Sequence, residues 1–138
     1  MRVVVDTNVF VSSFFGGQPR EIIDCWKRGD ITLCVSRDLV DEYIDVLTRL
    51  GIDSALVGEI LDLFASGYHL VFTAETPELR VVKRDPDDDM LFGCAVELEA
   101  KVIVTGNKAV RDIGRYMDIE VLTPAEFLAR MKDAPRAR

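Results

Sequence analysis

The sequence is poor in the residues that build histidine- and cysteine-based sites. Its 138 residues include one histidine, His69, so a histidine-based triad would have to use that side chain. Three cysteines, Cys25, Cys34 and Cys94, form no C-x-x-C pair and no cluster with histidine, which argues against a zinc site. We expect the cysteines to be buried free thiols, as in a reducing cytoplasm, and His69, which lies in an apolar run, to pack in the core.

Long apolar segments and phosphate-binding loops are also missing. The longest uncharged run, residues 7–19, is too short and too rich in glycine to span a bilayer. Asp6 interrupts the N-terminal apolar run too early for a secretory signal. We therefore expect a cytoplasmic protein that does not bind membranes. Neither G-x-x-x-x-G-K-[ST] nor G-x-G-x-x-G occurs, which disfavours a nucleotide-binding loop.

Basic residues are in the minority, with 17 Lys and Arg against 24 Asp and Glu and a net charge of −7. This balance argues against a protein that holds nucleic acid by bulk positive charge, but not against an enzyme whose metal ions neutralise an acidic site. The length and the 49% hydrophobic content predict one globular domain over residues 1–132. Residues 133–138 lack apolar anchors, and we expect a disordered tail there.

Apolar runs alternate with segments of helical period along the chain. Strands are predicted at 3–5, 31–35, 69–72, 102–105 and 120–122, and helices at 20–28, 37–50, 53–66, 88–100 and 124–132. This alternation predicts an α/β fold with three layers, α/β/α, in which helices cover both faces of a central parallel sheet of about five strands. Ser36 is placed to cap the helix at 37–50, and Pro124 to begin the last helix.

Parallel sheets of this kind bind ligands beyond the carboxyl ends of their strands. Asp6 follows the first strand directly, and Asn8 lies two residues further on. Asn107 follows the fourth strand, which ends in Thr105, and Asp112 lies five residues beyond Asn107. Turn and helix-cap chemistry would explain these polar residues equally well, so each signal is weak alone.

Two predicted helices add carboxylates to this edge of the sheet. Glu42 borders the apolar stripe of the helix at 37–50, although its stem could simply cover apolar surface. Four aspartates stand within residues 85–89, where helix capping must explain most of them. Asp89 opens the apolar side of the helix that follows and is our preferred inward-facing acid, whereas Asp88 is rotated away and ranks second. Clustered carboxylates repel each other unless cations neutralise them, and oxygen ligands suit Mg²⁺ or Mn²⁺.

Four segments of the chain, residues 3–12, 35–42, 84–95 and 102–107, resemble the PIN domain family in their order and spacing. The resemblance covers almost the whole chain and implies a PIN-like three-layer fold. It is closest to the bacterial and archaeal subgroup described as toxins of toxin–antitoxin systems.

The resemblance assigns the family's acids to residues of this sequence. Its three near-constant acids fall on Asp6, Glu42 and Asp89, and its variable fourth acid falls on Asn107. An aspartate is common at that fourth position, so the asparagine lowers the charge of the site by one. The resemblance implies that these four residues hold Mg²⁺ or Mn²⁺ and carry catalysis, with Asp112 as a candidate to replace the missing carboxylate.

The activity implied by the resemblance is that of a metal-dependent endoribonuclease, in which the ion orients a water molecule and stabilises charge on the attacked phosphate. Supporting hydrogen bonds are expected from Thr7, Asn8, Thr105 and Asp88. Four basic residues near the predicted sheet edge are candidates to contact RNA phosphates, although each could instead solvate a loop and pair with a neighbouring aspartate. They are Lys83, Arg84, Lys108 and Arg111. The subgroup also suggests two protein partners, an antitoxin that blocks the acidic site and a second copy of the chain. The apolar stretch 10–15 is a candidate surface for either partner, although core packing would explain much of it.

Three other interpretations remain open. A PIN-like module that binds RNA or a protein without cutting would fit the asparagine at position 107. A phosphatase of the haloacid-dehalogenase type would need a second aspartate where Asn8 stands. A receiver-like signalling domain would need Lys108 as the lysine after its late strand, and the order of the acids fits that domain less well.

Overall fold

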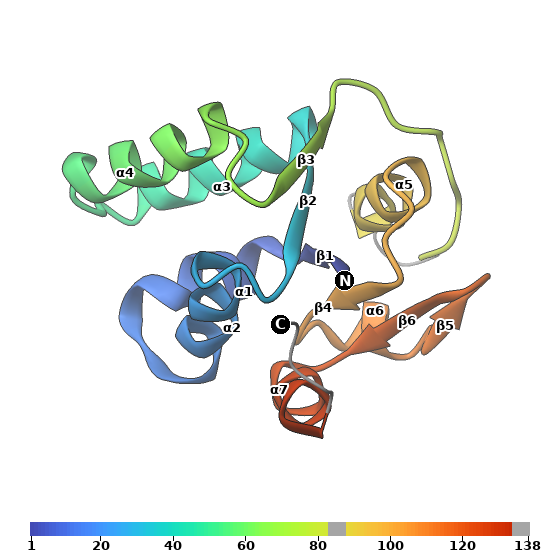
Figure 1. The fold of residues 1–138 in the computed structure, drawn as a ribbon. Helices are drawn as coiled ribbons and strands as arrows, with labels where there is room; N and C mark the ends of the chain where they lie inside the picture. The colour runs from blue at the N-terminus through green and yellow to red at the C-terminus, as the bar shows by residue number, and fades with distance from the viewer. Residues whose placement is uncertain (83–87, 134–138) are drawn as a thin grey trace.

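The computed structural model describes residues 1–82 and 88–133, and within them it forms one sheet of six strands (Figure 1). The strands are β1 (Arg2–Val5), β2 (Thr32–Ser36), β3 (Leu70–Thr73), β4 (Val102–Val104), β5 (Arg115–Tyr116) and β6 (Ile119–Leu122). Their order is β3-β2-β1-β4-β6-β5, and every neighbouring pair is parallel except β5 and β6. The predicted α/β fold with a parallel sheet is confirmed. The two residues of β5 are too few to show a period in the sequence.

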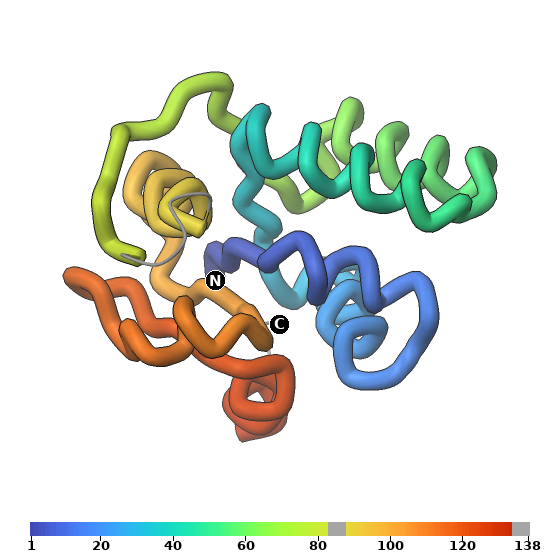
Figure 2. The backbone as a smooth tube through the Cα atoms, turned by 180° about the vertical axis from the view of Figure 1, so that it is seen from behind, coloured from blue at the N-terminus to red at the C-terminus, as the bar shows by residue number. Residues whose placement is uncertain are grey.

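Helices connect the strands and cover the sheet. They are α1 (Thr7–Ser12), the 3₁₀ turn η1 (Ser13–Phe15), α2 (Gly17–Lys27), α3 (Arg37–Arg49), α4 (Ser54–Ala65), α5 (Asp89–Glu97), α6 (Lys108–Arg111) and α7 (Pro124–Asp133). Helix α5 packs on β1, β2 and β4, while α2 and α7 contact each other on the other side of the sheet (Figures 1 and 2). Helices α3 and α4 form a hairpin that extends away from the sheet (Figure 1). The five predicted helices are present, and the short α1 and α6 were not predicted.

The core is centred on the strands that are covered on both faces. Val3, Val4 and Val5 of β1 are fully buried, as expected for a continuous apolar run in the middle of a parallel sheet. The ring of Phe10 stacks on that of Tyr43 with 4.1 Å between ring centroids, which joins α1 to α3. The three cysteines are free and buried, as predicted.

His69 does not lie in the core, and this prediction was wrong. The residue is exposed, has a φ of 39° and precedes β3 instead of lying within it. Its ring meets Tyr68 edge-on, with 4.6 Å between centroids, and a Cβ added at Gly29 would come within 2.8 Å of its Nε2 atom. The left-handed turn at His69 shifts the start of the strand by one residue and turns the imidazole outward.

The C-terminal end of the predicted domain can be compared with the structure only in part. Helix α7 ends at Asp133, one residue beyond the predicted domain, and the rest of the predicted tail lies outside the described residues. Across residues 1–82 and 88–133, no helix combines the length and apolar character needed to cross a membrane.

Candidate functional site

The candidate site is built around Asp6, at the junction between β1 and α1. The pairing of Val5 with Val104 brings this junction beside the end of β4, where the Asp6 N–H donates to the Val104 carbonyl at 3.0 Å. Asp6 is buried, with only 7% of the residue exposed. Its Oδ2 atom accepts a hydrogen bond from the Thr105 hydroxyl, and Oδ1 accepts the Asn8 N–H at 3.4 Å, which caps α1. The aspartate therefore caps a helix and also lies at the carboxyl edge of the sheet.

Helix α3 attaches to both sides of this junction. The Thr7 hydroxyl donates to Glu42 Oε1, and the Tyr43 hydroxyl donates to the carbonyl of Val5. Burial raises the pKa of Tyr43 well above its usual value, and the negative charges of nearby groups, Asp6 and Glu42 among them, raise it further. Glu42 is half-buried, as predicted, and the structure brings it close to the residues that flank Asp6.

Asn107 joins the end of β4 to the region before α5. Its backbone N–H donates to the Thr105 hydroxyl oxygen at 3.0 Å, and its side-chain oxygen accepts the Ala109 N–H at 2.8 Å, which caps α6. The side-chain nitrogen donates to Asp88 Oδ2 at 3.1 Å. Asp88 holds the N-cap position of α5 but makes no side-chain capping bond there, and its Oδ2 atom accepts the Asn107 side chain instead. The sequence had suggested that Asp88 turns away from the site.

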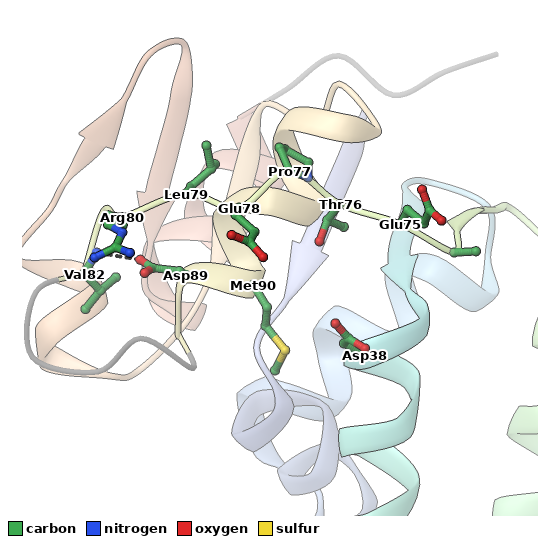
Figure 3. Close-up of a pocket in the computed structure, with 11 residues that line it drawn as sticks. Asp38, Glu75, Thr76, Pro77, Glu78, Leu79, Arg80, Val82, Asp89 and Met90 are labelled. Atoms are coloured by element: carbon green, nitrogen blue, oxygen red, sulfur yellow. Dashed lines mark hydrogen bonds between the residues drawn. The ribbon is translucent and has the colours of Figure 1, made fainter.

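Asp89 turns in a different direction from Asp88. Its Oδ1 atom accepts the N–H groups of Val81 and Val82 at 2.9 and 2.7 Å. Figure 3 shows this carboxylate next to the chain at Arg80 and Val82. The structure therefore does not bring Asp89 to Asn107, and the reason is that the segment before residue 83 supplies two backbone donors that no helical period in the sequence reveals.

A cleft of about 920 Å³ lies beside the first turn of α5. It is bounded by the start of α3, the segment at 74–82 and the start of α5 (Figure 3). Among the described residues, its charged lining consists of Asp38, Glu75, Glu78, Arg80 and Asp89. The described part of the lining therefore carries four carboxylates and one guanidinium and is predominantly acidic, and no motif in the sequence marks this cleft.

The predicted phosphate-binding residues are only partly described. Lys83 and Arg84 lie outside the described residues. Lys108 and Arg111 are exposed on α6, which begins directly after Asn107. Lys108 forms an ion pair with Asp112 at 2.9 Å, so the structure places this aspartate on the surface of α6 with a lysine as its partner.

The donor chemistry of the site suits a hard divalent cation, since Asp6 and Glu42 offer carboxylate oxygens. Among the described residues, however, no three His, Cys, Asp or Glu side chains lie close enough to form a metal-binding group. The site thus has two linked acids, Asp6 and Glu42, and a third, Asp88, that is connected to them through Asn107 and Thr105.

The apolar stretch at 10–15 is divided between the core and the surface. Phe10 and Val11 are buried, and Phe14 is half-buried. Phe15 is 69% exposed. Of the stretch that the sequence offers as a partner surface, Phe15 is therefore the aromatic ring most accessible to another chain.

The comparison with protein families agrees with this arrangement, whereas two other comparisons found no match. No curated protein and no solved structure matched the chain. A family model described as PIN domain matches residues 2–109, a span that includes β1 to β4 and every residue of the hydrogen-bonded network around Asp6. This span is more than half of the chain, which therefore belongs to the PIN domain family, whose members are generally nucleases.

Proposed function

We propose that the protein is a metal-dependent endoribonuclease that acts as the toxin of a toxin–antitoxin pair. The observation that carries the proposal is the buried carboxylate of Asp6 at the carboxyl end of β1. None of the ion pairs among the described residues includes Asp6 or Glu42. A buried carboxylate without a cationic side chain is costly, and a bound cation would remove that cost.

We assign Asp6, Glu42 and Asp88 as the residues that would hold Mg²⁺ or Mn²⁺, in part through bound water, because the three side chains lie too far apart to form one compact group of ligands. Asp88 takes the third place instead of Asp89, because Asn107 links Asp88 to Thr105 and Asp6, whereas Asp89 Oδ1 accepts the backbone N–H groups of Val81 and Val82. A bound ion of this kind lowers the pKa of a water molecule and stabilises negative charge on a phosphate. Thr7 and Thr105 each donate a hydroxyl proton to one carboxylate, which fixes where its second oxygen points.

The charge distribution indicates where RNA would lie. The carboxylates of the cleft beside α5 repel a phosphate backbone, so we place the RNA on the side of α6. Lys108 and Arg111 on this helix would contact phosphates on either side of the bond that is cut. Lys108 must then exchange its ion pair with Asp112 for a phosphate, which costs little because the pair is exposed.

The partners in this proposal are an antitoxin and a second copy of the chain. The acidic site favours an antitoxin segment that presents a basic side chain. Phe15, exposed at the end of the turn that follows α1, offers an apolar anchor for a partner chain. The three free thiols fit a protein of the reducing cytoplasm.

The test is cleavage of a labelled pool of structured and single-stranded RNAs in Mn²⁺, Mg²⁺ or EDTA. The wild-type protein is compared with Asp6→Asn, and Asp118→Asn serves as the matched control because that aspartate pairs with Lys101 on the surface. We expect metal-dependent cleavage by the wild type and the control, and a loss of at least 100-fold in Asp6→Asn. Cleavage that survives in Asp6→Asn would contradict the assignment of the site. RNA binding without cleavage by the wild type would favour the binding-module interpretation.

A further inference from the structure

The side chain of Asn107 is held at both ends by hydrogen bonds. Its oxygen accepts the Ala109 N–H at 2.8 Å, and its nitrogen donates to Asp88 Oδ2 at 3.1 Å. A backbone N–H can only donate, so the contact with Ala109 identifies the amide oxygen. The amide nitrogen must then face Asp88, and the orientation of the side chain is determined.

We propose that Asn107 is a positioning residue that holds the Asp88 carboxylate in place, and that it does not itself bind the metal ion. The inference rests on the proposed function, because Asp88 matters only if a metal site forms. The oxygen that a metal ion would need is directed into the first turn of α6, while the group that faces the acid is a neutral donor. A carboxylate at position 107 would instead present a like charge to Asp88.

The same residue also connects Asp88 to Asp6. The Asn107 N–H donates to the Thr105 hydroxyl oxygen at 3.0 Å, and that hydroxyl donates to Asp6 Oδ2. Thr105 is fully buried, so its hydroxyl is shielded from bulk water. Backbone and side chain of one asparagine thus fix the relative positions of two acids that lie 82 residues apart in the sequence.

The experiment titrates Mn²⁺ alone, without RNA, into four proteins: the wild type, Asn107→Ser, Asp88→Asn and the double variant. Serine preserves the cap of α6 but cannot donate an amide proton to Asp88. We expect Asn107→Ser to weaken Mn²⁺ binding about tenfold, as removal of an outer-shell partner does. In the Asp88→Asn background the same substitution should have no further effect, because the residue acts only through Asp88.

Two further measurements separate positioning from a loss of structure. Asp53→Ala removes the cap of α4, far from the acids, and should lower the melting temperature without changing Mn²⁺ affinity. Asn107→Ser should lower kcat and leave KM for RNA unchanged, and thermal unfolding in EDTA checks that each variant folds. Equal losses of Mn²⁺ affinity with and without Asp88 would overturn the inference while leaving the proposed function intact. A wild-type protein that binds no Mn²⁺ would overturn both.

Discussion

Two threonines control the acids of this site at the scale of single residues. Thr7 donates to Glu42 and Thr105 donates to Asp6, and both threonines are buried. A hydroxyl can donate to one carboxylate and still accept from a backbone N–H, as Thr105 does from Asn107. Valine has nearly the same shape but offers neither function, so substitution by valine separates hydrogen bonding from packing.

Thr105→Val should therefore weaken both the fold and the metal site. The Asn107 N–H and the Asp6 carboxylate would each lose a buried partner, which predicts a loss of about 1–3 kcal/mol in the free energy of unfolding. Mn²⁺ affinity should fall about tenfold, since Asp6 is no longer oriented. Urea unfolding and calorimetry measure the two effects. Thr48→Val, at an exposed position of α3, is the control and should change neither the free energy of unfolding nor the Mn²⁺ affinity. An unchanged Mn²⁺ affinity in Thr105→Val would contradict the role of Thr105 in orienting Asp6.

At the scale of secondary-structure elements, α3 joins the site to the sheet. It begins where β2 ends, and its middle carries both Glu42 and Tyr43. The helix is amphipathic, so the sequence predicts correctly which face of it turns inward. The predicted C-terminal end differs from the observed one by a single residue. Short elements cannot be predicted in this way, because they contain too few residues to show a period. The four residues of α6 make barely one turn and depend on the cap at Asn107.

The cap of α3 provides a test at this scale. Ser36 is buried, and its hydroxyl oxygen accepts the Leu39 N–H at 3.1 Å. Ser36→Ala should lower the free energy of unfolding by about 1–2 kcal/mol, measured by urea denaturation, because water cannot replace the lost acceptor. Asp53→Ala removes an exposed cap of α4, where water can substitute, and should cost less. A larger loss in Asp53→Ala than in Ser36→Ala would refute this explanation.

At the scale of the whole molecule, the sheet continues beyond the span of the family match. Residues 2–109 include β1 to β4, whereas β5, β6 and α7 follow that span and add two more strands beside β4. Helix α7 buries Phe127 completely and packs against α2. A bidentate ion pair between Arg130 and Glu120, with both distances 2.9 Å, joins α7 to β6 and lowers the pKa of Glu120. The C-terminal part is therefore an integral layer of the fold.

Because its thiols are buried, the folded protein should lose stability at alkaline pH. Burial raises the pKa of Cys34 to about 11 and that of Cys94 to about 12, from a value of 9.0. Between pH 9 and these raised pKa values, the unfolded chain loses thiol protons that the folded protein keeps. The free energy of unfolding is therefore highest well below pH 9 and falls as the pH rises through and above 9. The slope approaches about 1.4 kcal/mol per pH unit for each thiol once that thiol is fully ionised in the unfolded chain.

Urea unfolding with a reductant at pH 7.5, 9 and 10 measures this slope. The variant Cys34→Ala/Cys94→Ala should be less stable at pH 7.5, because it leaves small cavities, but should lose stability less steeply above pH 9. Comparing slopes instead of absolute stabilities removes the cavity effect. A slope that is the same in both proteins would show that other groups cause the dependence.

The sequence by itself determined the order of strands and long helices, the strand-end position of Asp6 and the inward tendency of Glu42. These features are local, since hydrophobic period, capping residues and the end of an apolar run can be read within about 15 residues. Only the tertiary structure decided the direction of Asp88 and Asp89, the outward position of His69 and the burial of Phe10. Each of these depends on a partner that is distant in the sequence or on one backbone turn, and neither leaves a periodic signal in the chain.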